Sequence, residues 1–82
     1  MAEVDVKLPS LGEDAGDEAR VSFWYVDVGE EVKEGDDLLQ MLTDKATFDV
    51  PSPVSGRVSA LLVEENQQVK VGQVLCRIRV EG

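Results

Sequence analysis

A chain of 82 residues is long enough for one small domain with a modest hydrophobic core. Its formal charge of −9 argues against nucleic acid as a partner, because phosphates would be repelled, and 30% charged residues favour a soluble protein. No apolar run approaches the roughly 20 residues that cross a bilayer, and the acidic start of the chain is unlike a signal or transit peptide. We therefore expect no membrane association and a location in the cytoplasm, or in the mitochondrial matrix if the source is eukaryotic.

The residue types present exclude most catalytic chemistry. Histidine, the commonest general base and metal ligand, does not occur in the sequence. The single cysteine, Cys76, can form neither an internal disulfide nor a zinc site, and its apolar neighbours predict a core residue rather than a reactive thiol. The acidic residues do not follow the spacing of a calcium loop, and no phosphate-binding glycine motif occurs. We expect neither a metal site nor catalysis by this chain alone.

The sequence pattern predicts a series of short β-strands. Residues 3–8 alternate apolar and charged side chains, which is typical of a half-buried strand, and the polar residues 9–18 predict a loop. Further strands are predicted at 19–28, 32–33, 38–42, 47–50, 57–63, 69–70 and 74–80. No stretch shows sustained helical periodicity, so the predicted fold class is all-β.

The two halves of the chain match when one is shifted by 37 residues. The tripeptide Arg-Val-Ser occurs at 20–22 and again at 57–59. Gly29, where we expect a positive φ, falls on Asn66, the residue next most tolerant of that conformation. Each half is too small to bury its own apolar face. We therefore expect a flattened β-barrel or sandwich of two antiparallel sheets with a pseudo-twofold internal repeat.

One predicted hairpin has no counterpart in the second half. Apolar, β-branched runs flank the tetrapeptide Thr43-Asp44-Lys45-Ala46. Because no glycine is present to favour a type I′ turn, we expect a slightly longer tip based on a type I turn that Asp44 opens, with the Lys45 side chain in water. Under the 37-residue shift, Lys45 matches Leu8 at the end of the first strand. We expect function at this break in the symmetry.

Lys45 is poorly placed for catalysis but well placed to be modified. A lysine becomes a nucleophile at neutral pH through burial or a neighbouring cation, and we expect neither here. An exposed tip can instead enter the cleft of another protein. The residues alone leave open a simple solvated lysine, and Lys7, Lys33 and Lys70 are weaker candidates for modification, since they lie along a strand or near repeated turns.

The acidic residues are concentrated in the first half. Residues 1–49 hold fourteen acids and four bases, whereas residues 50–82 hold three acids and four bases. Simple solubility explains a negative total but not this asymmetry. We therefore hypothesise a docking surface for a basic partner in the part of the chain that carries Lys45.

At these residues the sequence resembles the lipoyl domains of dihydrolipoamide acyltransferases, which belong to 2-oxo acid dehydrogenase complexes such as the pyruvate dehydrogenase complex. The resemblance runs from about Val4 to Val80. Its most specific parts are Thr43-Asp44-Lys45-Ala46-Thr47, Val50-Pro51-Ser52-Pro53 and Gly56, and the segment 7–13 and the turns at Gly29 and 34–36 are also similar.

This resemblance implies that Lys45 carries lipoate in amide linkage to its Nζ. It implies that Asp44 and Ala46 help a lipoate ligase or lipoyl transferase to recognise the hairpin. It also implies a partner-recognition loop, formed by Leu11, Gly12, Glu13, Asp14 and Ala15, that lies near the lipoyl-lysine and helps the decarboxylase to choose its carrier. Leu42 departs from the family, in which many members have a glutamate, and this departure concerns partner preference.

By the same resemblance, residues 1–82 form a single, monomeric carrier domain (core about 3–80) that is excised from a longer acyltransferase and has no catalytic residues of its own. The lipoyl-lysine then acts as a swinging arm, which shuttles acyl groups between a 2-oxo acid decarboxylase, the acyltransferase core and dihydrolipoamide dehydrogenase. The sequence does not distinguish pyruvate, 2-oxoglutarate, branched-chain or acetoin-derived substrates.

Three other kinds of domain are alternatives to a lipoyl domain of an acyltransferase. A biotin carrier has the same fold, but such proteins usually place methionine on both sides of the modified lysine, where this chain has Asp44 and Ala46. An unmodified lipoyl-like domain could serve as a structural or adaptor hairpin. A glycine-cleavage carrier is also lipoylated, but its chain is longer and differently flanked.

Overall fold

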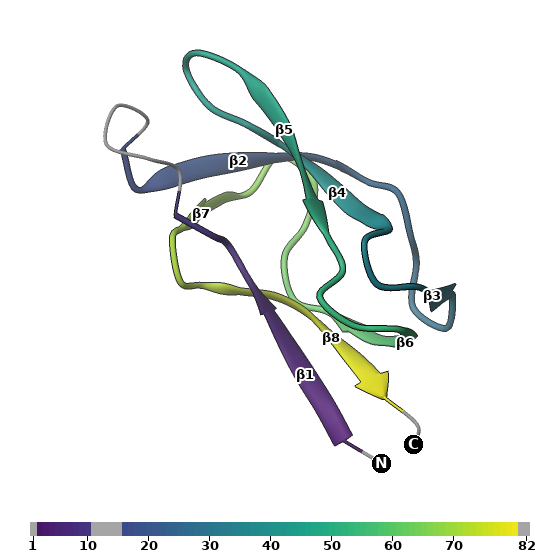
Figure 1. Cartoon of the computed structure of the whole chain (residues 1–82). Coiled ribbons are helices and arrows are strands. Elements are labelled where there is room, and N and C mark those ends of the chain that lie inside the picture. The colour runs from purple at the N-terminus through teal and green to yellow at the C-terminus, as the bar shows by residue number, and fades with distance from the viewer. Residues whose placement is uncertain (1, 11–15, 81–82) are drawn as a thin grey trace.

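The computed structural model describes residues 2–10 and 16–80, and all regular structure in these ranges is β (Figure 1). The strands are β1 (Ala2–Lys7), β2 (Glu18–Trp24), β3 (Glu31–Val32), β4 (Asp37–Leu42), β5 (Thr47–Pro51), β6 (Gly56–Leu61), β7 (Gln68–Lys70) and β8 (Val74–Val80). They form two four-stranded antiparallel sheets in the orders β1-β8-β6-β3 and β5-β4-β2-β7. The predicted all-β class with two antiparallel sheets is confirmed. Among the described residues, no helix is long and apolar enough to cross a membrane.

The hydrophobic core lies between the two sheets and draws on every strand. Alternation along the strands places one set of side chains inward, as in β8, where Cys76 and Ile78 are buried and Arg77 and Arg79 are exposed. The buried apolar residues are Val6, Leu8, Ala19, Val21, Val32, Leu38, Leu39, Met41, Val50, Val58, Val63, Val69, Leu75, Cys76 and Ile78. The ring of Trp24 is only partly buried against the core. Its Nε1 donates to the Val63 carbonyl at 3.1 Å, and this hydrogen bond links the first half of the chain to the second.

Cys76 is a core residue, as the sequence predicts, and burial raises the pKa of its thiol to about 11. Because the thiolate is the reactive species, we expect Cys76 to resist the disulfide reagent DTNB at pH 8 in the native protein and to react within minutes in urea. Ionisation in the unfolded chain begins near its normal pKa. Unfolding should therefore become easier as the pH rises from about 9 to about 11, by roughly 3 kcal/mol in total. Urea unfolding of wild type and Cys76→Ala over this pH range checks the effect, and equal pH slopes for the two proteins would contradict it.

The internal repeat appears in space as two equivalent sheets. A shift of 37 residues carries β2, β3 and β4 onto β6, β7 and β8, and strands from both halves share each sheet. The turns match in detail: Gly29 (φ 94°) donates its N–H to the Val58 carbonyl, and Asn66 (φ 70°) donates to the Val21 carbonyl. The predicted positive φ at Gly29 is confirmed.

The expected match of Lys45 with Leu8 is wrong. Leu8 donates to the Gln73 carbonyl and accepts from the Gly72 N–H, and Ser52 makes the same two bonds with Asp36 and Gly35. Leu8 therefore corresponds to Ser52, which lies 44 residues later rather than 37. The difference arises because the connection before β2 is seven residues longer than the one before β6: ten steps separate Leu8 from Glu18, whereas three separate Ser52 from Ser55, the residue equivalent to Glu18.

The hairpin tip between β4 and β5 instead corresponds to the break between the chain ends. Glu3 of β1 pairs with Arg79 of β8, as Thr47 of β5 pairs with Leu42 of β4. Figure 1 shows the β4–β5 connection at the opposite end of the molecule from the start of β1 and the end of β8. Among the described residues, the β4–β5 hairpin therefore joins two strands whose equivalents, β8 and β1, are the last and first strands of the chain.

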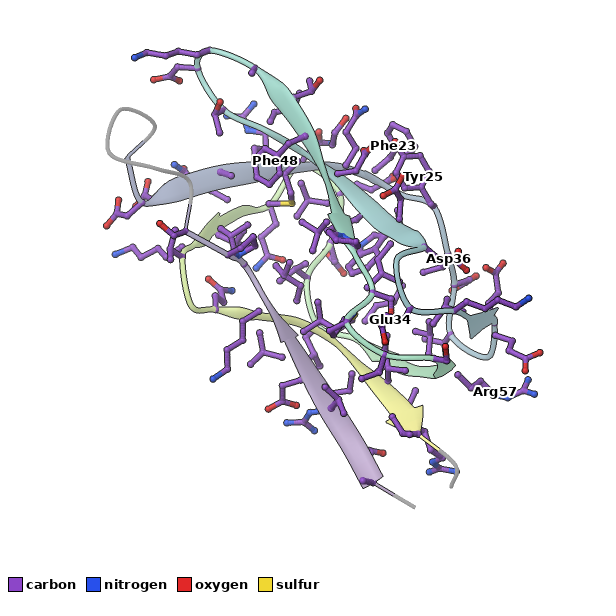
Figure 2. All side chains as sticks on the ribbon, viewed as in Figure 1. Phe23, Tyr25, Glu34, Asp36, Phe48 and Arg57 are labelled. Carbon is purple, nitrogen blue, oxygen red and sulfur yellow. The ribbon has the colours of Figure 1, made fainter. Side chains whose placement is uncertain are left out.

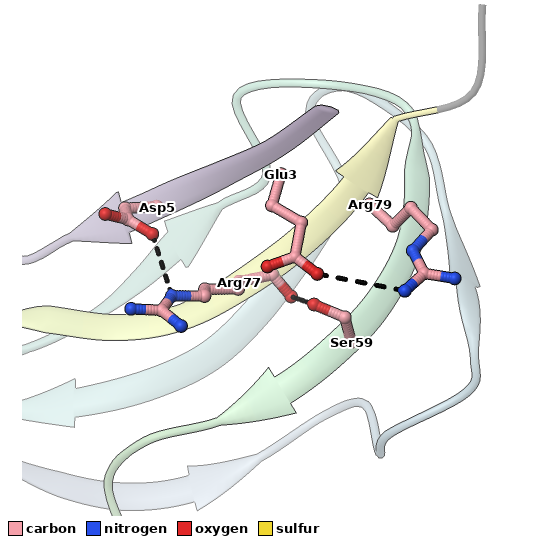
Figure 3. A network of polar contacts seen from close by, with 5 residues as sticks. All are labelled: Glu3, Asp5, Ser59, Arg77 and Arg79. Carbon is pink, nitrogen blue, oxygen red and sulfur yellow. Dashed lines mark hydrogen bonds and ion pairs between the residues drawn. The ribbon is translucent and has the colours of Figure 1, made fainter. Parts of the chain in front are cut away.

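The outer face of the β1–β8–β6 sheet carries a polar network (Figure 3). The Arg77 Nε donates to Asp5 Oδ1 at 3.0 Å, Arg79 lies 3.9 Å from Glu3, and the Ser59 hydroxyl donates to the Arg77 carbonyl at 3.2 Å. Exposed pairs of this kind contribute little to stability each. They tie β1 to β8 and β8 to β6 on the exposed side of this sheet.

Candidate functional site

The candidate site is the tip of the β4–β5 hairpin. The two strands pair from Asp37 opposite Pro51 to Leu42 opposite Thr47, and a bulge lies between Asp37 and Leu39. Met41 and Val50 are buried, so the inner face of the hairpin is anchored in the core. Residues 43–46 continue beyond this anchored ladder and form the tip.

Thr43 organises the turn. Its backbone N–H donates to the Ala46 carbonyl at 2.8 Å, and its Oγ1 also lies 3.1 Å from that carbonyl. The same Oγ1 accepts from the backbone N–H groups of Lys45 and Ala46 at 3.3 and 3.2 Å. The expectation that Asp44 opens the turn is therefore wrong: a threonine hydroxyl takes the place of a backbone acceptor, as serine and threonine do in turns.

This turn places Asp44 and Lys45 at the apex. Asp44, Lys45, Ala46 and Thr47 are all exposed, so the expected exposure of Lys45 is confirmed. Among the described residues other than glycine only Asn66 has a positive φ, so the tip is not a type I′ turn. The apex can thus present a primary amine without backbone strain.

We expect Thr43→Val to loosen the tip without unfolding the domain. The change removes the shared acceptor of two N–H groups while keeping the shape of the side chain, which should cost about 1 kcal/mol. Amide hydrogen exchange at Lys45 and Ala46 should become several-fold faster. Thr47→Val, on the first residue of β5, is the matched control, and equal exchange at the tip in both variants would contradict this role of Thr43.

A polar groove of about 480 Å³ runs beside the tip and is lined by Gly16, Asp17, Glu18, Ala19, Arg20, Leu42, Thr43, Asp44 and Gln68. Arg20 pairs with Leu42 across the β2–β4 ladder, and the amide of Gln68 donates to Glu18 at 2.6 Å. No sequence pattern indicated Arg20 or Gln68, because only the register of β7, β2 and β4 brings them to the hairpin. Leu42, the departure from the family pattern, is half-buried in this wall.

The predicted partner-recognition loop, Leu11, Gly12, Glu13, Asp14 and Ala15, lies outside the described residues. The described residues on its C-terminal side, Gly16 to Glu18, line the groove beside Thr43 and Asp44. Proximity between that loop and Lys45 therefore stays a prediction.

The other lysines occupy different settings. Lys7 pairs with Val74 at the end of β1, and Lys33 and Lys70 begin equivalent turns in which Asp36 and Gln73 side chains accept from their backbone N–H groups. All are exposed, but none stands at the apex of a hairpin. Within residues 2–10 and 16–80, no three acidic, cysteine or histidine side chains are placed to hold a metal ion.

Comparison with known proteins agrees with this geometry. The family model Biotin_lipoyl, described as "Biotin-requiring enzyme", matches residues 4–78, so the chain belongs to this family. Within the family, it is a lipoyl domain of the kind found in lipoamide acyltransferases, as the sequence predicts.

Three findings show this assignment. The chain is 43% identical over 77 residues to the lipoamide acyltransferase component of the branched-chain alpha-keto acid dehydrogenase complex of Pseudomonas aeruginosa, which covers 94% of this chain and 18% of that protein. It is 39% identical over 77 residues to the acetyltransferase component of the Corynebacterium glutamicum pyruvate dehydrogenase complex, with 94% and 11% covered. The solution structure of the lipoyl domain of the Azotobacter vinelandii 2-oxoglutarate dehydrogenase complex matches 96% of this chain and 99% of that one, at 26% identity and a TM-score of 0.76.

The shared architecture extends beyond lipoyl proteins. A crystal structure of Kluyveromyces lactis urea carboxylase matches 96% of this chain and 6% of that one with a TM-score of 0.80, at 19% identity, which shows a common fold alone. The chain spans less than a fifth of the length of the acyltransferases that it resembles, 18% and 11% in the two named above.

Proposed function

We propose that Lys45 carries lipoate in amide linkage and that this domain presents the modified lysine to a series of enzymes. The observation that supports the proposal is the position of Lys45 at the exposed apex of the one hairpin that interrupts the pseudo-symmetry of a lipoyl-type domain. Asp44 and Ala46, which are exposed on either side, are the proposed recognition residues for the modifying enzyme. The biotin alternative is disfavoured by the acyltransferase relatives and by this Asp-Lys-Ala sequence.

The residues at the tip suit such an attachment. An exposed amine on a short, tied turn can enter a ligase active site, and acylation removes its charge. When bound, lipoate supplies a dithiolane that takes up and hands on acyl groups. The lysine side chain and the lipoyl chain together contain about a dozen bonds, which gives a stretched reach on the order of 14 Å.

The chain's own residues contribute position and rigidity. Thr43 fixes the backbone of the apex, and the buried Met41 and Val50 fix the hairpin to the core, so that flexibility is confined to the lysine and its attachment. Tethering of this kind raises the effective concentration of a carried group at each active site. The bond-making chemistry belongs to the cofactor and the partner enzymes.

The proposed partners follow from the relatives. We propose that a 2-oxo acid decarboxylase loads the arm, that an acyltransferase core unloads it and that dihydrolipoamide dehydrogenase reoxidises it. We further propose that the 82 residues are one domain of a longer, cytoplasmic acyltransferase. The groove formed by residues 16–20 and the loop before it are the proposed surface by which a decarboxylase selects its carrier.

A two-stage reaction tests this function. The chain is first incubated with lipoate ligase, lipoate and ATP, and then with decarboxylases specific for pyruvate, 2-oxoglutarate and branched-chain 2-oxo acids, and intact mass is recorded after each stage. We expect one lipoyl increment and then one acyl increment with one class of decarboxylase. Absence of the lipoyl increment, or no acylation by any of the three, would overturn the proposal.

A further inference from the structure

The outer face of the β5-β4-β2 sheet carries two exposed aromatic rings. A bulge between Val21 and Phe23 turns Phe23 outward, where it lies opposite Gln40, and Gln40 lies opposite Asp49 of β5. Phe23 is 37% and Tyr25 41% exposed. Phe23, Tyr25, Gln40 and Asp49 form the surface that we call the aromatic–acidic patch.

The patch is pre-organised. The two rings pack edge to face with centroids 4.8 Å apart at 78°, and the Tyr25 hydroxyl donates to Asp49 Oδ1 at 2.8 Å. Figure 2 shows both rings together on the outside of the sheet, whereas Phe48 lies on the hairpin nearer its tip. Fixed side chains lose little conformational entropy when a partner binds.

The fold does not require these aromatic residues. The 37-residue repeat places Ala60 and Leu62 at the positions of Phe23 and Tyr25, on the outer face of the other sheet. The equivalent bulge is present there, between Val58 and Ala60, so the strand register is the same and the side chains differ. Exposed aromatic rings beyond what the fold requires indicate an interaction surface.

The charge of the patch is negative. The hydrogen bond to Asp49 raises the pKa of Tyr25, and partial burial and the charges of Asp49 and Asp37 act in the same direction. The ion pairs Asp5–Arg77 and Glu3–Arg79 lie on the other sheet and do not include Asp49. A carboxylate beside two aromatic rings is the environment that a cation prefers.

The acidic residues of the first half of the chain do not form one continuous surface. Glu31 lies opposite Arg57 in the β3–β6 pair, and Figure 2 places Glu34 and Asp36 at the β3 end of the molecule, away from the hairpin tip. The Gln40–Asp49 pair is instead two residues along the strands from the last pair of the hairpin, Leu42–Thr47, a distance of roughly 7 Å. A protein that takes the tip into its active site would reach the aromatic–acidic patch.

We propose that the aromatic–acidic patch is the docking site for an arginine side chain on the surface of the decarboxylase that acts on the lipoyl group. The planar guanidinium stacks on the exposed rings and donates to Asp49, whose Oδ1 is already oriented by Tyr25. Arginine fits this site better than lysine, because it combines stacking with a forked donor and is less strongly hydrated. The identity of that enzyme class rests on the proposed function; the chemistry of the patch does not.

Binding of a model peptide tests the chemistry of the patch. The ¹⁵N-labelled domain is titrated with the peptide acetyl-Gly-Arg-Gly-Arg-Gly-amide and with the same peptide carrying lysine. We expect the largest amide shifts at Phe23, Tyr25, Gln40 and Asp49, and binding at least threefold tighter for the arginine peptide. Shifts spread equally over the β3 end, or equal affinity for both peptides, would overturn the proposal.

Matched variants separate the patch from general acidity and from the proposed function. Asp49→Asn and Tyr25→Phe should weaken arginine-peptide binding at least threefold, whereas Glu65→Gln, which removes the same charge as Asp49→Asn at another exposed site, should not. After lipoylation, Asp49→Asn should raise the KM of the decarboxylase about fivefold with an unchanged extent of lipoylation.

Each outcome has one meaning. Failure of lipoylation in the wild type would overturn the proposed function and leave the peptide result intact. Equal KM values for lipoylated Asp49→Asn and Glu65→Gln would overturn the docking role. Concentration-dependent dimerisation that Tyr25→Ser abolishes, measured by sedimentation, would show that a second copy of the chain covers the patch and would also overturn it.

Discussion

The variant Lys45→Arg should fold like the wild type and take up no lipoate. Arginine keeps the positive charge and the length of the side chain at the apex, but its guanidinium stays protonated and is not the primary amine that a ligase acylates. The expected effect is complete loss of the lipoyl mass increment under conditions that modify the wild type fully. Intact mass spectrometry measures the increment, and thermal unfolding verifies that the tip substitution leaves stability within about 0.5 kcal/mol.

Lys33→Arg and Lys70→Arg are the controls for this prediction, since both lysines are exposed and begin equivalent turns. Both variants should be lipoylated at the wild-type rate. A lipoyl increment in Lys45→Arg, or its loss in either control, would show that the attachment site lies elsewhere.

The largest effect on stability is expected for Gly56→Ala. Gly56 begins β6, which pairs with β8 in the same sheet, and a Cβ at this position would collide with the Arg79 carbonyl and would lie 2.9 Å from Ile78 Cγ2. A backbone carbonyl in a sheet cannot move aside cheaply, so we expect a loss of about 3 kcal/mol or more, a large part of the stability of so small a domain. Urea unfolding followed by Trp24 fluorescence measures this loss.

Gly29→Ala separates the steric effect from a change in backbone freedom. Nothing lies within 4 Å of a Cβ at Gly29, but its φ of 94° is strained for alanine, so the expected cost is about 1 kcal/mol. Equal losses in the two variants would contradict the close packing of β6 against β8.

The fold was predictable from the sequence because two independent signals agree. Strand alternation gives the elements, and the repeated Arg-Val-Ser and the paired turns at Gly29 and Asn66 give the relation between the sheets. The match of Lys45 with Leu8 failed because a gapless shift cannot cross connections of unequal length. The correct match of Leu8 with Ser52 can be seen only from the backbone hydrogen bonds that follow β1 and β5.

The site was predictable only where local sequence determines it. The position of Lys45 follows from local sequence, since a polar tetrapeptide between two β runs folds as a hairpin tip. The role of Thr43 is a matter of side-chain geometry that propensities do not describe. The aromatic–acidic patch depends on the bulge between Val21 and Phe23, which reverses the face that simple alternation predicts for Phe23.

The most direct test of the central claim is to map the modification on the wild-type chain. The protein is incubated in parallel with lipoate ligase and lipoate and with biotin ligase and biotin, digested, and analysed by peptide mass spectrometry. We predict a lipoyl group on the peptide that contains Lys45, on no other lysine, and no biotin on any peptide. A biotinyl increment at Lys45, or a lipoyl group on Lys7, Lys33 or Lys70, would contradict the account.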